Sequence, residues 1–266
     1  MSELKKSKVL AMIPARYGSV RFPGKILAPI LGKSLIQRTY ENARQCELLD
    51  EIIIATDDMR IFEHVTSFGA KAVMTSPDCP TGTDRMAEAL DKLPHLQDYP
   101  IVINIQGDEP CLNPNAISKV VQILIDNPEA VMSTAVVKLT SEEDIRDPSI
   151  PKCIFDKHGN ALYFSRSLIP VNNRGQYSPK ATYYGHLGIY AFRQHFLKQY
   201  GKLPATPLQQ IEELEQLKVL EHGYGIKVAI VEEFSVGVNH PEDIKKVEQY
   251  LCKQNTSSSP AASVHR

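Results

Sequence analysis

The stretch "KVLAMIPARYGSVRFPGK", residues 8–25, joins a short apolar run to a loop rich in cations. The apolar run has the length and composition of a buried strand. Arg16, Arg21 and Lys25 follow it within ten residues, and such a group of cations suits the oxygens of a polyphosphate. Because open α/β folds bind ligands where their strands end, the stretch predicts an anion site after the first strand. The alternative is a surface loop with solvated charges.

The loop ends in Gly-Lys, as a P-loop does, but its spacing differs. A P-loop has the pattern G-x-x-x-x-G-K-[ST], in which the last hydroxyl binds Mg²⁺. Here five residues separate Gly18 from Gly24, and Ile26 follows Lys25. We therefore exclude a P-loop kinase or ATPase.

Outward from this stretch, apolar runs alternate with helical patterns. The runs at 51–56, 70–75, 100–106 and 130–137 predict strands. Apolar spacing between them predicts helices at 34–49, 59–69, 84–93 and 114–127. Short, continuously apolar strands alternating with helices indicate an α/β domain with a mostly parallel sheet covered on both faces.

The regular alternation of strand and helix patterns ends at about residue 144. We expect a hairpin at 151–166, a β-rich stretch at 183–193, one helix at 207–223, a strand at 227–233 and a closing helix at 241–253. The prediction is one unit spanning 8–252, with a smaller β-rich insertion at about 144–200. Residues 1–7 and 253–266 are predicted to be flexible tails.

A second motif, "NIQGDEP" at 104–110, ends an apolar run with Asp108 and Glu109. A carboxylate at the end of a central strand, opposite a cationic loop, suits a metal ion that bridges nucleotide phosphates. The alternative is a strand-ending turn with solvated acids. "TGTDRMAE" at 81–88 is also open to a simpler interpretation, in which Thr83 or Asp84 caps the following helix.

Composition excludes several classes of protein. With 30 basic and 31 acidic residues the formal charge is −1, which argues against a nucleic-acid or anionic-membrane binder. The five cysteines form no CxxC pair, so neither a disulfide framework nor a zinc cluster is expected. No apolar run has the length of a signal peptide core or a membrane span. We expect a cytoplasmic protein without membrane insertion.

Seven motifs stand in an order that resembles the 3-deoxy-manno-octulosonate cytidylyltransferases, or CMP-Kdo synthetases. They are "IPARYGSVRFPGK", "TGTDR", "INIQGDEP", "ALYFSR", "GHLGIYAFR", "IEELEQLKVL" and "GVNHPEDI". The resemblance covers about residues 8 to 252. It implies a Rossmann-like nucleotidyltransferase fold, usually homodimeric. The implied reaction transfers CMP from CTP to the anomeric hydroxyl of 3-deoxy-D-manno-octulosonate (Kdo), with Mg²⁺, releasing pyrophosphate and giving CMP-Kdo for lipopolysaccharide synthesis.

The resemblance also implies roles for individual residues. The implied catalytic residues are Arg16, Lys25 and Asp108. Those around the nucleotide are Pro14, Ala15, Arg16, Arg21, Lys25, Thr81, Gly82, Thr83 and Arg85. Those around the sugar acid are Gln106, Arg166, His186, Tyr190, Glu215 and Gln216. The implied metal ligands are Asp108 and the residue at position 239.

At position 239 the chain departs from the family pattern. The family's late motif commonly reads Gly-Val-Asp, and its aspartate is a second metal ligand, whereas this chain has Asn239. An amide oxygen can coordinate Mg²⁺ but brings no charge. We also expect a cation and hydrogen-bond donors for the Kdo carboxylate, which Arg166 and His186 could supply. For His186 the alternative is a hydrogen-bonded core histidine.

Two further functions remain open at this point. One is a cytidylyltransferase for another acidic sugar, such as sialic acid. The other is a non-catalytic nucleotide-binding or regulatory protein that kept the fold, an interpretation that Asn239 favours.

Overall fold

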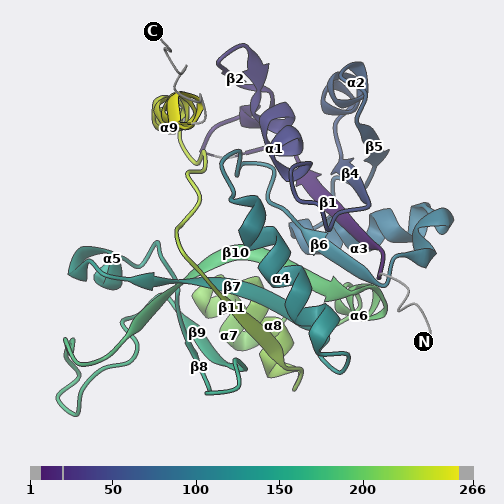
Figure 1. Ribbon diagram of the computed structural model, residues 1–266. Coiled ribbons are helices and arrows are strands. Elements are labelled where there is room, and N and C mark those ends of the chain that lie inside the picture. Colours follow the sequence, from purple (N-terminus) through teal and green to yellow (C-terminus); the bar gives the residue numbers. More distant parts are fainter. Residues whose placement is uncertain (1–6, 20, 258–266) are drawn as a thin grey trace, which may run out of the picture.

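The first apolar run forms β1 (Val9–Ala15), which lies inside the main sheet. In the computed structural model, which describes residues 7–19 and 21–257, the strand order is β11-β7-β10-β6-β1-β4-β5. β1 pairs in parallel with its two neighbours, and β4 pairs in parallel with β5 (Figure 1). These strands are β4 (Glu51–Thr56), β5 (Lys71–Met74) and β6 (Ile101–Asn104). The predicted α/β fold and its parallel half are confirmed.

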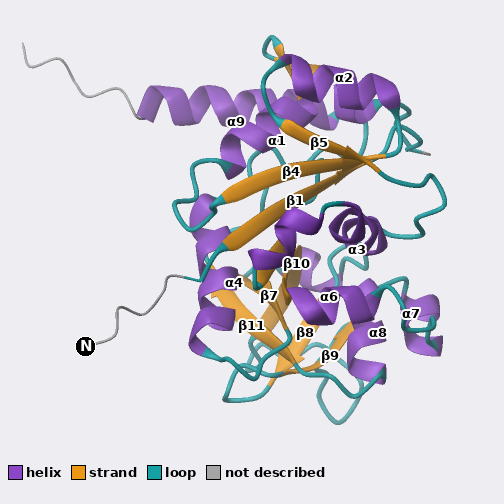
Figure 2. Ribbon diagram, turned by 90° about the vertical axis from the view of Figure 1, so that its right-hand side faces the viewer, coloured by secondary structure: helices purple, strands orange, loops and turns teal. Residues whose placement is uncertain are grey.

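Alternate residues of β1 pack on opposite faces of the sheet, as a strand buried on both sides requires. Val9, Ala11 and Ile13 pack against one group of helices, whereas Leu10 and Met12 pack against another. Figure 2 shows the sheet between these layers. The first layer contains α1 (Leu35–Ala43), α2 (Met59–Ser67) and α4 (Pro114–Asp126). The second contains α3 (Gly82–Lys92), α6 (Gln194–Tyr200) and α8 (Glu215–Glu221).

The β-rich stretch after residue 180 lies in the centre of the main sheet. It forms β10 (Tyr183–Arg193), which runs antiparallel between β6 and β7 (Met132–Leu139). Most of its residues are buried, so it needs a strand on each side and helices on both faces. We expected it in an insertion at about 144–200, but residues 183–193 belong to the main sheet. β11 (Ile226–Val231) then completes the edge, parallel to β7.

The predicted hairpin is present beside β10. It consists of β8 (Lys152–Phe155) and β9 (Ala161–Ser165), which pair antiparallel. The Asp156 carboxylate accepts hydrogen bonds from the backbone N–H groups of His158 and Asn160, and this closes the turn. A short helix, α5 (Glu142–Arg146), precedes the hairpin.

The single helix expected at 207–223 is instead two helices, α7 (Pro207–Glu212) and α8. The chain breaks at Glu213, whose φ of 51° is left-handed. Arg166 stabilises the break, because its guanidinium donates to the backbone carbonyls of Glu212 and Glu213. The Glu212 carboxylate in turn accepts hydrogen bonds from the Ser165 hydroxyl and the Arg166 N–H. Glu215 and Gln216 thereby begin a new helix.

The C-terminal helix packs beside the N-terminal loop rather than on the sheet. Residues 232–242, here called the strap, lead from β11 to α9 (Asp243–Ser257), which lies beside β2 (Figure 1). Val238 and Val247 pack there with Ile30 and Leu35. The remaining short elements are η1 (Lys25–Leu27), β2 (Pro29–Ile30), β3 (Lys33–Ser34) and η2 (Pro94–Asp98).

The predicted tails fall mostly outside the described residues, which exclude 1–6 and 258–266. Residues 253–257, expected in the C-terminal tail, continue α9. Within the described part of the chain, every helix is too short or too polar to cross a bilayer.

Candidate nucleotide-binding and catalytic site

A pocket of about 280 Å³ opens where β1 and β6 end, beside the first turn of α3. It is the site expected from the parallel topology. Ten of the predicted site residues line this nucleotide pocket: Pro14, Ala15, Arg16, Arg21, Lys25, Thr81, Gly82, Arg85, Gln106 and Asp108. Sequence reasoning missed the others, which are Ser19, Ile26, Cys79, Pro80 and Gly107. Cys79 and Pro80 directly precede the Thr-Gly-Thr segment, and that adjacency could have indicated them.

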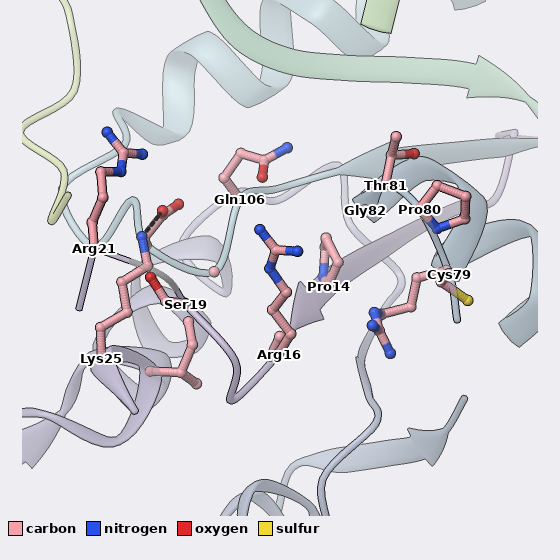
Figure 3. Close-up of a pocket in the computed structure, with 15 residues that line it drawn as sticks. Pro14, Arg16, Ser19, Arg21, Lys25, Cys79, Pro80, Thr81, Gly82 and Gln106 are labelled. Carbon is pink, nitrogen blue, oxygen red and sulfur yellow. Dashed lines mark hydrogen bonds and ion pairs between the residues drawn. The ribbon is translucent and has the colours of Figure 1, made fainter. Parts of the chain in front are cut away.

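The two ends of the nucleotide pocket differ in chemistry. Arg21 and Lys25 lie toward one end, Pro80 and Thr81 lie toward the other, and Arg16 is between them (Figure 3). Arg16 is exposed and has no hydrogen-bond partner within residues 7–19 and 21–257. The cationic end matches a polyphosphate, and the other end, where the Arg85 guanidinium is paired with Asp57, leaves room for a flat base.

Lys25 links three segments at the cationic end. Its ammonium group forms an ion pair with the Asp108 carboxylate and donates to the Val238 carbonyl at 3.1 Å. The Val238 N–H donates to the Asp108 carbonyl at 2.9 Å. Gly24, just before Lys25, has a φ of 70°, which glycine adopts without strain. The cationic loop, the end of β6 and the strap therefore form one connected unit.

Asn239 lies at the edge of this unit. Arg21 donates to its side-chain oxygen at 3.1 Å. The Asp243 carboxylate accepts hydrogen bonds from the backbone N–H groups of Asn239 and His240, at 3.0 and 2.9 Å. Asp243 thus fixes the turn that presents Asn239, and its carboxylate is occupied by these bonds and by the Lys246 ammonium group.

The donor set at this place fits Mg²⁺. Asp108 and Asn239 offer hard oxygen donors, and each already holds a cationic group, Lys25 or Arg21. Within the described residues there is no group of three or more His, Cys, Asp or Glu side chains placed to hold a metal ion. Phosphate oxygens and water would have to complete the six ligands that Mg²⁺ takes.

Glu109, next to Asp108, does not line the nucleotide pocket, and its carboxylate lies against the strap. Burial raises the pKa of its carboxyl to about 7. One of its oxygens has no hydrogen-bond partner among the described residues. A Cβ atom on Gly237 of the strap would lie 2.8 Å from the other oxygen, so a larger residue there would have to displace the carboxylate. Of the two acids, only Asp108 lines the nucleotide pocket.

Two residues of the α3 turn make structural contacts. Arg85 lines the pocket, but its guanidinium donates to Asp57 at 2.8 Å and to the Thr75 hydroxyl at 2.5 Å. Thr83, expected beside the nucleotide, is buried off the pocket and donates to Glu215 at 2.9 Å. The helix cap is Thr81, whose hydroxyl accepts from the Asp84 N–H. The simpler interpretation of this segment as a cap was therefore close, although Thr81 fills the role.

Of the predicted sugar-acid residues, only Gln106 lines the nucleotide pocket. The other five, here called the sugar-acid cluster, lie just after β9, on β10 and at the start of α8: Arg166, His186, Tyr190, Glu215 and Gln216. The Tyr190 hydroxyl donates to the Gln216 side-chain oxygen at 3.1 Å, and both residues are buried. The Gln216 amide nitrogen has no partner in the described part of the chain.

His186 is a neutral side chain. It is buried, its Nε2 lies 2.9 Å from the Thr134 hydroxyl, and its ring meets Phe164 edge-on. Burial lowers the pKa of its imidazole to about 3. The core-histidine alternative describes this environment, and the imidazole supplies no positive charge. Arg166 is the cation of the cluster, although its guanidinium is bound to backbone carbonyls in this conformation.

Residues 10–233 match the family described as Cytidylyltransferase. A 3-deoxy-manno-octulosonate cytidylyltransferase of Protochlamydia amoebophila (strain UWE25) is 57% identical over 249 residues, which cover 94% of this chain and 96% of that protein. The chain belongs to the 3-deoxy-manno-octulosonate cytidylyltransferase family. A further relative, from Arabidopsis thaliana and described as mitochondrial, is 50% identical over 95% of this chain and 86% of that protein.

Solved structures agree with this placement in the CMP-Kdo synthetase family. A CMP:2-keto-3-deoxy-manno-octonic acid synthetase complexed with CTP aligns with a TM-score of 0.86 and 38% identity. The alignment covers 93% of this chain and all of that chain. A 4-diphosphocytidyl-2C-methyl-D-erythritol synthase from Anaerococcus prevotii, at 14% identity and a TM-score of 0.59, shares the fold alone.

Proposed function

We propose that this chain transfers CMP from CTP to Kdo, giving CMP-Kdo and pyrophosphate. The family membership supports the reaction, since relatives at 57% and 50% identity carry that activity in their names. The observation on the chain itself that supports it most is the nucleotide pocket, in which Arg16, Lys25 and Asp108 stand together at the ends of β1 and β6.

The cations act on the triphosphate. In an in-line attack by the sugar hydroxyl on the α-phosphorus, negative charge grows on the departing pyrophosphate. Arg16 and Lys25 offset that charge, and Arg21 binds at the same end of the pocket. Pro14, Ala15, Thr81 and Gly82 surround the base and ribose. Positioning and charge neutralisation account for the catalysis, and no covalent intermediate is needed.

Asp108 would hold the metal ion, with Asn239 as a second oxygen donor. When bound, Mg²⁺ would neutralise phosphate charge and lower the pKa of a coordinated hydroxyl. The carboxylate is half-buried and paired with Lys25, so a bound ion would compete with the ammonium group for it. Asn239 adds no negative charge, and the phosphates themselves therefore contribute more to metal binding.

The sugar acid binds between Gln106 and the sugar-acid cluster. Arg166 supplies the positive charge for the Kdo carboxylate, and neutral His186 supplies a hydrogen bond. We also propose that the chain works in the cytoplasm and as a homodimer, as its family resemblance implies.

The test is pyrophosphate release from CTP with Mg²⁺ and a panel of sugar acids that includes Kdo and sialic acid. We expect turnover with Kdo alone. Turnover with sialic acid instead would replace the proposed substrate. CTP binding without pyrophosphate release from any sugar would leave a nucleotide-binding regulatory protein.

A further inference from the structure

Asn104 is a fully buried polar residue at the end of β6. It pairs with Met12 of parallel β1 on one side and with Tyr190 of antiparallel β10 on the other. It therefore lies where the sheet changes direction, between the nucleotide pocket and the sugar-acid cluster. A buried amide is costly unless its donors and acceptor are bonded, so its partners show what it does.

A chain of hydrogen bonds runs through Asn104. The Gln106 side-chain nitrogen donates to the Asn104 oxygen at 3.4 Å. The Asn104 nitrogen donates to the Thr83 hydroxyl at 3.4 Å. The Thr83 hydroxyl donates to the Glu215 carboxylate at 2.9 Å. Four side chains from β6, the loop after it, α3 and α8 are thereby connected.

The chain has a fixed direction when the Glu215 carboxyl is ionised, because a carboxylate only accepts and a hydroxyl has one proton. Because Thr83 gives its proton to Glu215, it must accept from Asn104, which then turns its oxygen toward Gln106. Gln106 meets that oxygen with one N–H and keeps its carbonyl oxygen and second N–H for the nucleotide pocket that it lines.

The two ends of the chain are the places where the sugar acid is proposed to bind. Gln106 lines the nucleotide pocket, while Glu215 opens α8 beside Gln216, which Tyr190 holds. We infer that Asn104 and Thr83 are positioning residues that orient the Gln106 amide and the start of α8 for the sugar acid. This inference rests on the proposed function.

The experiment compares Thr83→Val, which keeps the shape and removes the hydroxyl, with Thr83→Ser, which keeps the hydroxyl. We expect Thr83→Val to raise KM for Kdo by about tenfold, the equivalent of one lost hydrogen bond. The Kd for CTP, measured by calorimetry without sugar, should stay within about twofold because the charged contacts remain. Thr83→Ser should restore most of the KM for Kdo.

Asn104→Leu is the second variant, since it removes both amide contacts at similar volume, and it should shift KM for Kdo in the same way. Should Thr83→Val fail to fold, judged by circular dichroism, Asn104→Leu decides. Ser133→Ala is the matched control, because it removes a buried hydroxyl that bonds only the Val120 carbonyl among the described residues. It should change thermal stability but not KM.

Three outcomes separate the possibilities. An unchanged KM for Kdo in folded Thr83→Val and Asn104→Leu would overturn the inference. An equal rise in KM for Kdo and in Kd for CTP would also overturn it, since that indicates general loosening. No turnover of CTP and Kdo by the unmodified protein would instead reject the proposed function.

Discussion

The nucleotide pocket and the sugar-acid cluster are two polar regions with opposite organisation. In the pocket, cationic side chains line an open cavity, and Arg16 points into it without a partner in the described part of the chain. In the cluster, Tyr190 and Gln216 are buried and bonded to one another, and the Arg166 guanidinium is bound to backbone carbonyls. One region is arranged to receive a ligand, and the other is arranged around its own hydrogen bonds.

The two regions should differ in what they give up when a ligand binds. A triphosphate can meet Arg16 directly, whereas Lys25 and Arg21 must each release one side-chain partner, Asp108 or Asn239. A sugar acid that contacts Arg166 or Gln216 must exchange internal hydrogen bonds for its own. Each exchanged bond is worth about 1 kcal/mol net, so binding there is sensitive to small shifts of α8.

Lys25→Met tests the role of the cations in the nucleotide pocket and should give the largest effect. We expect turnover to fall about 100-fold or more, by analogy with the loss of a charge-stabilising donor. The free energy of unfolding should also fall, by about 1–3 kcal/mol, because the Asp108 carboxylate and the Val238 carbonyl lose their ammonium partner. Stopped assays of pyrophosphate release check the rate, and Lys33→Met is the control, since its ion pair with Glu41 lies on the surface. Equal activity of both variants would contradict the role of Lys25.

Glu215→Gln tests the cluster side through pH. Burial raises the pKa of this carboxyl from 4.5 to about 7. A raised carboxyl pKa adds stability below pH 4.5 that is lost as the pH rises through 7. The substitution should therefore raise the melting temperature at about pH 8 and have less effect at about pH 5. Melting curves of both proteins across this pH range check the result. A difference in melting temperature that does not change with pH would show that the pKa of the Glu215 carboxyl is not raised.

Tyr190→Phe tests how much the internal hydrogen bonds of the sugar-acid cluster stabilise the fold, because it removes the bond to Gln216. The Gln216 oxygen would lose its hydrogen bond inside the core, and we expect a loss of about 1–2 kcal/mol in the free energy of unfolding. Urea denaturation measures it. Tyr184→Phe is the control, because Tyr184 is only half-buried and packs its ring against Phe155. A larger loss in the control would show that the Tyr190 hydroxyl is not the important contact.

Asn239→Asp should have the smallest effect. A second carboxylate near Asp108 should strengthen Mg²⁺ binding severalfold, because the charge of the ligands sets the affinity of such sites. The change should appear as a lower Mg²⁺ concentration for half-maximal turnover and as tighter Mg²⁺ binding by calorimetry in the presence of CTP. An unchanged Mg²⁺ requirement would place position 239 outside the metal's ligands, with its side chain serving only Arg21.

The pocket could be predicted from sequence because its residues lie in a few short segments at the ends of strands. Topology alone brings Arg16, Lys25 and Asp108 to one edge of the sheet. The break between α7 and α8 could not be predicted, since the pattern of 207–223 is continuous. The break is accompanied by hydrogen bonds from the Arg166 guanidinium, which comes from a distant part of the sequence, to the backbone carbonyls at the break.

Two other features depended on long-range contacts in the same way. β10 has the composition of any buried strand, and only its pairing with β6 and β7 places it in the main sheet. In the sequence, Thr83 lies between Gly82 and Arg85, which both line the pocket. Its place in the first turn of α3 nevertheless directs its hydroxyl to Glu215. A helix turns side chains to different faces, which a linear motif does not reveal.

The most direct test compares two adjacent acids, one facing the pocket and one buried beneath the strap. Asp108→Asn and Glu109→Gln keep the shape and replace each carboxyl by an amide, and pyrophosphate release from CTP, Kdo and Mg²⁺ is measured for both. We predict that turnover falls about 100-fold or more in Asp108→Asn and stays within about threefold in Glu109→Gln. Full activity in Asp108→Asn would contradict the assignment of the nucleotide pocket as the catalytic site.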